Sequence, residues 1–528
     1  MNRQAELAAL RRPPQVDVLV VGGGIAGAGV ALEAARSGAK VVLVEARDFA
    51  SGTSSRSSKL VHGGLRYLAQ GQFGLTRASV HERDALLRDA TGLVQPLRFL
   101  LPVREGDRNG RVKLGLGLAL YDRFAGRRTR RWHTAAELLA QAPPLAPQGL
   151  RGGWSYLDAQ TDDARLVLRV LAEARSLGAC TLNHVEVESL SREAGRVAGA
   201  TLHDRAGDER FELRARCVIN ATGAWADALR GTLGRPPALR PLRGSHLLLP
   251  AWRLPLPQAV AMFHPVDARP VFALPWEGAT LVGTTDVDHR EALAQEPRIT
   301  RPEFDYLMQA LHHHFPALGL DDTDVLSTWS GVRPVVASGR AVDPSREARE
   351  DLVLEEDGLI TVTGGKLTTF RSTALQALRL AAPQVPALSG LRNETRVLSP
   401  VAPDVDAAFA DLPSALHSRW LARFGTLAPQ VRAAAREGEL ASIGPTEVTW
   451  AELRWACRDE AVVHLDDLLL RRTRLGLLLR DGAAALLPRL QPLVQQELGW
   501  SDTRWQDEAA RYLELIARCH GVPEKEPA

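Results

Sequence analysis

Three glycines near the start of the chain, Gly22-x-Gly24-x-x-Gly27, have the spacing that binds the pyrophosphate of a dinucleotide. They follow a short apolar run and begin an alanine-rich segment that we expect to be helical. Gly22 permits a tight turn, Gly24 lets the pyrophosphate approach the backbone, and Gly27 lets helix and strand pack closely. A second apolar run ends in Glu45, which can accept hydrogen bonds from both ribose hydroxyls and disfavours a 2′-phosphate. The pattern therefore predicts FAD or NAD rather than NADP.

A dense run of small hydroxyl residues and glycines, residues 53–67, follows this acid. Such residues let the backbone lie close to a flat, extended ligand and supply many hydrogen-bond donors. On composition alone the run could also be a flexible serine loop. We expect it to contact the cofactor through Thr53, Ser54, Ser55, Ser58, Lys59, Gly63, Gly64 and Leu65.

Two later segments that end in glycines make FAD the preferred cofactor. Each follows an apolar strand, and the second is expected to open a helix. The N-terminus of that helix and the Lys366 cation could together stabilise a reduced flavin anion. The residues expected to contact the cofactor are Ala221, Thr222, Gly223 and Trp225 in the first segment, and Gly364, Gly365, Lys366, Leu367 and Thr368 in the second.

The predicted elements must bring these distant segments together. At 528 residues the chain is too long for one core, so two or three domains are expected. We predict an α/β protein (α+β overall), with a discontinuous Rossmann-like FAD-binding domain, an inserted antiparallel β-rich substrate domain and a C-terminal helical domain. The expected limits are 15–95 with 155–238 and 330–385 for the first, 96–154 with 239–329 for the second, and 404–528 for the third.

Composition limits the possible partners and compartments. The net charge of +3 and the aromatic content of 5% argue against nucleic-acid binding. The four cysteines have no metal-binding spacing, so we expect no metal site and buried thiols in a reducing compartment. No secretory signal and no apolar segment of the ~18 residues needed to span a bilayer is visible. We therefore expect a cytoplasmic protein, which could lie on a membrane surface; peripheral association with the cytoplasmic membrane is what the family resemblance described below implies.

The expectation of membrane attachment rests on residues 98–131. This stretch carries ten lysines and arginines against three acidic residues, and it contains the apolar patch Leu114–Tyr121. An apolar patch flanked by cations suits the headgroup region of an anionic membrane. The alternative is a buried helix with a solvated basic collar.

Taken together, these segments closely resemble the FAD-dependent, quinone-linked (aerobic type) glycerol-3-phosphate dehydrogenase family. The resemblance covers nearly the whole chain, and the string Ser-Ser-x-Ser-Ser-Lys-Leu-x-His-Gly-Gly-Leu-Arg-Tyr within residues 53–67 is highly specific. It implies a homodimeric enzyme at the inner-leaflet membrane surface that oxidises sn-glycerol 3-phosphate to dihydroxyacetone phosphate and passes electrons to a quinone. The segments that carry the resemblance are 22–27, 53–67, 221–225, 283–286, 331–334 and 364–368, with 451–453 and 468–474 in a helical cap domain.

The implied substrate carries a phosphate dianion beside a secondary alcohol, so the site needs fixed cations and a base. Planar arginine forks suit a phosphate, and a histidine with an ordinary pKa of ~6.5 suits the base. The base is His62 or His246, although either could be a core histidine. Lys366 could polarise the carbonyl oxygen, bind the reduced flavin or cap a helix. The candidate phosphate contacts are Arg66, Arg333 (also a catalytic candidate), Arg346 (with Arg349 as its competitor), Tyr67 and Thr285.

Three other functions remain open. A glycerol-3-phosphate oxidase would share fold and substrate but use oxygen and release hydrogen peroxide. An FAD-dependent amine or amino-acid oxidase is less favoured, because three arginines are more than one carboxylate needs. A non-catalytic FAD protein could use residues 404–528 to bind a partner.

Overall fold

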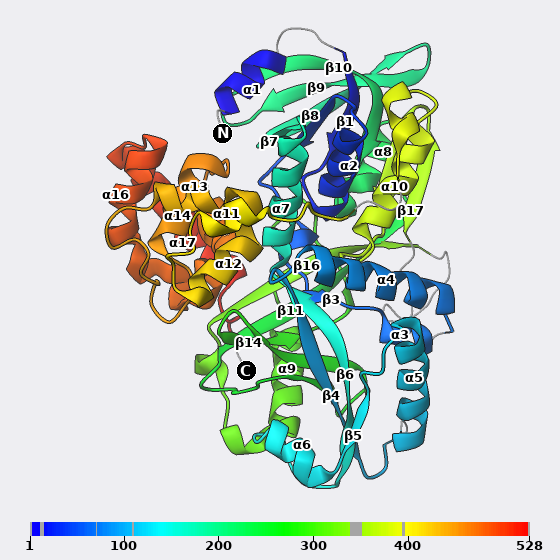
Figure 1. The fold of residues 1–528 in the computed structure, drawn as a ribbon, viewed down its shortest axis with the longest axis vertical. Coiled ribbons are helices and arrows are strands. Elements are labelled where there is room, and N and C mark those ends of the chain that lie inside the picture. The colour runs from blue at the N-terminus through cyan, green and yellow to red at the C-terminus, as the bar shows by residue number, and fades with distance from the viewer. Residues whose placement is uncertain are drawn as a thin grey trace.

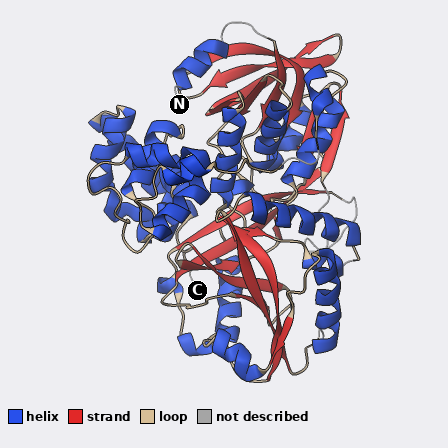
Figure 2. Ribbon diagram, viewed as in Figure 1, coloured by secondary structure: helices blue, strands red, loops and turns tan. Residues whose placement is uncertain are grey.

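The computed structural model describes residues 3–10, 15–69, 71–107, 110–337, 351–392 and 396–525. Figure 1 shows two sheet-containing regions stacked along the long axis, with the C-terminal helices packed beside their junction. Figure 2 separates these helices from the strands of the two sheets. Each sheet is assembled from segments that lie far apart in the sequence.

The first sheet has a parallel centre. β1 pairs in parallel with both β2 and β10, and β10 pairs in parallel with β18. The apolar strand residues are almost all buried, as expected for a sheet covered on both faces. The strands are β1 Val16–Val21, β2 Val41–Glu45, β7 Cys180–Asn183, β8 Val185–Glu193, β9 Arg196–Asp204, β10 Glu209–Asn220, β17 Leu352–Glu356 and β18 Leu359–Thr363.

Three helices pack beside one another against this sheet (Figure 1). They are α2 Ile25–Arg36, α7 Asp163–Ser176 and α10 Phe370–Ala381. Their small and apolar residues form one continuous buried cluster with the strands. Glu45 and the glycine segments at Gly22, Gly223 and Gly364 therefore lie at or after the ends of strands of one sheet.

The second sheet is mostly antiparallel, and β4 pairs with β12 as a parallel exception. One end of the sheet is formed by β11, which pairs with β14, β15 and β16. The strands are β3 Leu60–Val61, β4 Val94–Arg104, β5 Arg131–His133, β6 Leu150–Thr161, β11 Leu239–Pro250, β12 Ala259–Phe263, β13 Pro270–Trp276, β14 Ala279–Gly283, β15 Val287–Asp288 and β16 Ser327–Val336. The helices associated with this half are α3 Leu65–Ala69, α4 Phe73–Asp89, α5 Arg111–Phe124, α6 Ala135–Gln141 and α9 Arg301–His314.

The C-terminal region is helical. Its leucine periodicity reflects burial, because the leucines form a core shared with the second sheet. The helices are α11 Pro403–Ala407, α12 Ser414–Phe424, α13 Ala428–Ala434, α14 Trp450–Asp459, α15 Leu475–Leu478, α16 Leu487–Leu498 and α17 Asp502–Cys519, with a π-helical turn at Asp467–Arg472.

The predicted fold class is confirmed, since a discontinuous parallel-centred domain, an antiparallel β-rich region and a C-terminal helical region are all present. The domain limits stay predictions; β6 crosses the expected limit at residue 154. Cys217, Cys457 and Cys519 are buried thiols, and Cys180 is partly exposed. Within the described residues, no helix is both long and apolar enough to cross a membrane.

Candidate active site

A cavity of about 610 Å³ lies where the glycine turn, the hydroxyl run and the two later glycine segments meet. It is lined by many glycines and hydroxyl residues, with a few larger side chains such as Trp225 and Phe370, from segments more than 300 residues apart in the sequence. A cavity of this size with a glycine- and hydroxyl-rich wall suits a dinucleotide, because the backbone can approach the phosphates closely. The predicted cofactor residues that line it are Gly22, Gly24, Glu45, Thr53, Ser54, Ala221, Thr222, Gly223, Trp225, Gly364, Gly365, Lys366 and Leu367.

The glycine turn has the geometry that its spacing predicts. Gly22 has a φ of 113°, and a Cβ there would lie 2.5 Å from the carbonyl oxygen of Ala221. A Cβ on Gly27 would lie 1.9 Å from the carbonyl oxygen of Gly22, so helix α2 could not pack so closely with any other residue. Gly27 therefore allows α2 to pack against the turn, and it does not line the cavity.

Glu45 ends β2 at the cavity wall. Its carboxylate accepts backbone hydrogen bonds from Gly23 at 2.6 Å and Arg47 at 2.9 Å. Burial raises the pKa of Glu45, and these two bonds oppose that effect. Each carboxylate oxygen has more than one acceptor site, so both can still accept ribose hydroxyls.

The hydroxyl run is only partly at the cavity. Thr53 and Ser54 line it, and Ser54 Oγ accepts from the Ile25 amide at 3.0 Å, which ties the run to the start of α2. Ser57, which was not predicted, also lines the cavity. Nothing in the local pattern separates Ser57 from its neighbours, because the backbone path decides which serine faces the ligand.

Other members of the run do not line the cavity. Lys59 is completely buried between Trp276 and Trp329, and its Nζ contacts Asp163 at 2.8 Å and donates to the Ser55 carbonyl at 2.6 Å. Burial lowers the pKa of Lys59 to about 8, although Asp163 opposes the shift. The remaining predicted cofactor residues outside the lining are Ser55, Ser58, Gly63, Gly64, Leu65 and Thr368.

A first cluster of candidate catalytic groups adjoins the cavity at Lys366. Its Nζ lies 3.7 Å from the centre of the Tyr67 ring, and the Tyr67 and His62 rings are 6.1 Å apart. Thr368 Oγ1 donates to the His62 carbonyl at 3.2 Å. The structure thus brings together His62, Tyr67 and Lys366, which the sequence could only place in separate motifs.

A second cluster lies on β11, on β16 and in the connection that follows β14. Arg333 Nη1 donates to Asp286 at 3.0 Å, and its Nη2 donates to Thr284 Oγ1 at 3.0 Å. A Cβ on Gly244 would lie 2.2 Å from Arg333 Nη2, so this glycine makes room for the guanidinium. The carboxylate and hydroxyl hold the arginine fork in a fixed orientation.

His246 belongs to this second cluster. Its Nε2 is 2.8 Å from Ser58 Oγ, and its ring stacks on Trp329 with centres 5.2 Å apart. Burial, followed by the nearby Arg333 and Lys59 cations, lowers the pKa of His246 well below its ordinary value. The imidazole is therefore neutral at neutral pH, as a general base must be.

The remaining candidate phosphate-binding residues are Thr285, Arg66 and Arg346. Thr285 Oγ1 donates to Glu303 at 2.8 Å and accepts from the Ser245 amide at 2.9 Å, so its hydroxyl is engaged in the protein interior. Arg66 lies in α3, with its side chain outside the described part of the structure. Arg346 and its competitor Arg349 fall outside the described residues. Thr284, the neighbour of Thr285, is the residue that contacts Arg333.

The late glycine pair does not open a helix directly. α10 begins at Phe370, five residues after Gly365, and a turn carrying Lys366 and Leu367 comes between them. The prediction of a helix that begins at these glycines was therefore wrong. Because threonines 368 and 369 are buried in that turn, the chain reorients before the helix can start.

The fold and cavity define a flavin-dependent oxidoreductase. Residues 17–379, well over half of the chain, match the family of FAD dependent oxidoreductases. Residues 381–505 match the C-terminal domain of alpha-glycerophosphate oxidase. The glycine cradle and the hydroxyl donors at the cavity wall fit FAD, which is the cofactor of this class.

Two bacterial relatives indicate which group of FAD-dependent oxidoreductases the chain belongs to. The chain is 35% identical over 484 residues to the aerobic glycerol-3-phosphate dehydrogenase of Staphylococcus saprophyticus, covering 87% of this chain and 86% of the relative. It is 40% identical over 391 residues to that of Staphylococcus epidermidis, covering 73% and 70%. This chain belongs to the aerobic glycerol-3-phosphate dehydrogenase family of FAD-dependent enzymes.

Solved structures of other proteins share the fold of this chain. The glycerol-3-phosphate dehydrogenase from Bacillus halodurans complexed with FAD superposes with a TM-score of 0.78 at 29% identity, covering 98% of this chain and 96% of that one. The L-alpha-glycerophosphate oxidase of Mycoplasma pneumoniae gives a TM-score of 0.58 at 19% identity, covering 74% and 99%. The second likeness shows a shared fold.

Proposed function

We propose that this enzyme oxidises sn-glycerol 3-phosphate to dihydroxyacetone phosphate and passes the electrons to a membrane quinone. The observation that carries the proposal is the position of Lys366, which lines the large cavity and also contacts the Tyr67 ring. A cofactor cavity thereby adjoins a cluster of groups suited to an alcohol substrate. FAD, when bound, supplies the hydride acceptor for C2 of the substrate.

FAD would be held by the segments that line the cavity. The amides at the start of α2 suit its pyrophosphate, and Glu45 suits its ribose hydroxyls. Thr53, Ser54 and Ser57 would offer hydroxyl contacts. The segments around Gly223 and Gly364 complete the wall.

Arg333 would bind the substrate phosphate. The Asp286 and Thr284 contacts orient its planar fork, which matches two phosphate oxygens. Arg66, Arg346, Tyr67 and Thr285 are proposed as further contacts on the strength of the resemblance. Several cations are appropriate because a phosphate monoester is nearly doubly charged at neutral pH.

His246 would accept the proton of the C2 hydroxyl. Its Nε2 is hydrogen-bonded to Ser58 Oγ, and its Nδ1 is buried without a hydrogen-bond partner among the described residues. Nδ1 is therefore the atom at which we place the incoming proton. His62, beside Tyr67 and Lys366, is the second candidate for this role.

Anaerobic addition of glycerol 3-phosphate tests the function. We expect the purified enzyme to be yellow and its visible flavin absorbance to be bleached by this substrate. Glycerol and an amino acid serve as controls, and neither should bleach the flavin at the same concentration. A yellow protein that glycerol 3-phosphate leaves unbleached would instead be a non-catalytic flavoprotein.

The electron acceptor needs its own measurement, because the C-terminal match is to an oxidase domain. In air, stoichiometric hydrogen peroxide release would make the enzyme an oxidase. Turnover that requires an added soluble quinone analogue, with little peroxide, would support the quinone-linked dehydrogenase.

We also propose that the enzyme works as a homodimer at the inner leaflet and attaches to it through α5. Val112 and Leu116, one helical turn apart, are 74% and 67% exposed, and Lys113 is exposed beside them. Leu118 and Tyr121 are buried, so only part of the apolar patch predicted from sequence can meet lipid. Size-exclusion chromatography with light scattering would show whether a dimer forms.

Leu116→Glu should weaken membrane binding at least roughly tenfold, because burying a leucine contributes about 1.5–3 kcal/mol. The measurement is co-sedimentation with anionic vesicles at low salt. Val266→Glu is a matched control, since Val266 is 73% exposed on the β12–β13 turn, which is not part of α5. Equal binding of both variants and the unaltered enzyme would exclude α5 as the attachment site.

A further inference from the structure

The loop that carries the cavity serines is held at two points by the C-terminal domain. We call residues 48–59 the cofactor loop; it leads from the end of β2 to β3. Ser51, Gly52, Thr53, Ser54 and Ser57 of this loop line the large cavity. The holding groups come from the run Arg471-Arg472-Thr473-Arg474, more than 400 residues later.

The first anchor is Asp48, at the start of the cofactor loop. Arg472 donates to both of its carboxylate oxygens, Nη1 at 2.6 Å and Nη2 at 2.7 Å, and Arg471 Nε adds a third charged contact. Arg472 is completely buried. A bidentate arginine–carboxylate pair fixes direction as well as distance.

The second anchor lies at the far end of the loop and is centred on Arg474. Its Nη1 donates to the Ser55 carbonyl at 3.3 Å, and its Nη2 donates to Asp163. Asp163 in turn accepts from the Ser57 amide at 3.0 Å and hydroxyl at 2.7 Å, and from Lys59 Nζ. The Arg474 guanidinium thus contacts Ser55 directly and Ser57 through Asp163.

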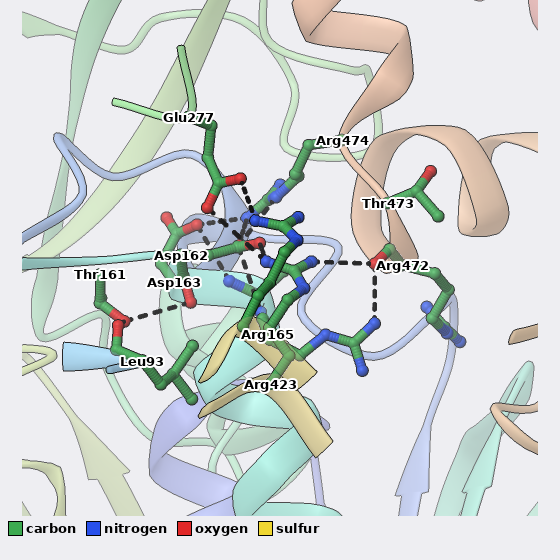
Figure 3. A network of polar contacts seen from close by, with 12 residues as sticks. Leu93, Thr161, Asp162, Asp163, Arg165, Glu277, Arg423, Arg472, Thr473 and Arg474 are labelled. Atoms are coloured by element: carbon green, nitrogen blue, oxygen red, sulfur yellow. Dashed lines mark hydrogen bonds and ion pairs between the residues drawn. The ribbon is translucent and has the colours of Figure 1, made fainter. Parts of the chain in front are cut away.

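Figure 3 shows the groups around this second anchor. Arg474 Nε donates to Asp162 Oδ1 at 2.9 Å, and Arg423 Nη1 donates to Asp162 Oδ2 at 3.2 Å. The Arg472 carbonyl accepts from Arg165 at 2.7 Å. The C-terminal backbone itself is therefore bound to helix α7, which begins beside the cofactor loop.

The charges are shared between the two regions of the chain. Asp48, Asp162 and Asp163 are almost completely buried, and buried carboxylates need paired cations. Burial raises the pKa of Asp48, but Arg472 and Arg471 together outweigh this effect and hold the pKa below its ordinary value. Asp48 and Asp162 draw their guanidinium partners from the C-terminal domain, whereas Asp163 also has Lys59.

We propose that Arg472 and Arg474 are positioning residues for FAD: they hold the cofactor loop at its two ends in the conformation that binds the cofactor. The C-terminal domain is then part of the cofactor site, although none of its described residues, 404–525, lines the cavity. The inference rests on the proposed FAD site, because the loop must contact FAD for its position to matter.

The competing explanation is a docking interface with no bearing on FAD. Arg454 is a matched control, because it is buried to a similar degree and its partners, Glu439 and Glu497, belong to the C-terminal domain itself. Arg454→Gln and Arg474→Gln both break a buried ion-pair network, but only Arg474→Gln releases the cofactor loop.

The experiment compares the holoenzymes of the unaltered chain, Arg474→Gln and Arg454→Gln. We expect both variants to melt at a lower temperature. Only Arg474→Gln should bind FAD about 5–150-fold more weakly, the range typical of coupling between sites, as measured by flavin fluorescence on release. Hydrogen exchange of peptides covering residues 48–59 should accelerate in Arg474→Gln and stay unchanged in Arg454→Gln.

Equal FAD affinity and equal loop exchange in the two variants would overturn the inference and leave a docking interface. If the unaltered enzyme itself binds no FAD, the proposed function fails instead. Should Arg474→Gln not fold, Arg474→Lys keeps the charge but loses the fork, and FAD should still dissociate at least about fivefold faster.

Discussion

Replacing Arg333 by alanine should raise the KM for glycerol 3-phosphate by about 10²–10⁴-fold while FAD remains bound. Hydrogen bonds to charged groups each contribute about 1.5–3 kcal/mol, and a fork can make two of them to a phosphate. Arg333 is held for this by Asp286 and Thr284, which lie in the connection between β14 and β15. Steady-state kinetics with flavin absorbance measured in parallel would check both halves of the prediction.

Arg240→Ala provides the control. Arg240 lies on β11, which pairs with the strand that carries Arg333, and it forms an ion pair with Asp288 at 2.7 Å. Its removal should leave KM within about twofold, the scale of a surface ion pair. An unchanged KM in Arg333→Ala would remove Arg333 from the phosphate site.

Replacing His246 by glutamine should lower kcat by about 10²–10⁴-fold, the usual contribution of a general base. The protein should still bind FAD and glycerol 3-phosphate, since His246 does not line the large cavity. The Ser58 contact and the Trp329 stack fix the imidazole, so glutamine cannot reproduce a basic nitrogen there. Rapid-mixing reduction of the flavin would measure this step directly.

The pH dependence supplies a second readout. Burial and the nearby Arg333 lower the pKa of His246. Its imidazole therefore stays neutral when the pH falls below ~6.5, the ordinary pKa of histidine. The acid limb of kcat/KM should accordingly lie below pH ~6.5, and it should disappear in His246→Gln.

His264→Gln is the matched control for these measurements. His264 is also buried and stacked on an aromatic ring, Tyr306, in the same half of the molecule. It should leave kcat within about twofold. If His62→Gln abolishes both kcat and the acid limb while His246→Gln does not, the base is His62.

The local elements of the cofactor site could be predicted from sequence because their signals are local. The turn at Gly22 needs a positive φ, and Gly27 must lack a Cβ so that helix and strand can touch. Apolar runs ending at Glu45 and before Gly364 marked buried strands that do end at the cavity. Steric rules of this kind act within a few residues.

The helix after Gly365 shows where such reasoning fails. Glycines often precede a helix, yet here the chain makes a turn first and α10 starts at Phe370. Helix starts depend on which backbone amides find partners, and in this turn the partners are set by packing.

By itself, then, the amino-acid sequence determined the dinucleotide turn, the strand that carries Glu45 and the resemblance that led to the family. The tertiary structure alone decided what each side chain does. Lys59 lies in the most specific string of the chain, yet Asp163 draws it into the interior. Ser58 meets His246, 188 residues away, and Arg474 reaches the cofactor loop from the C-terminal domain. Periodicity and spacing report burial and local geometry, whereas the partner of a buried charge depends on which distant segment folds beside it.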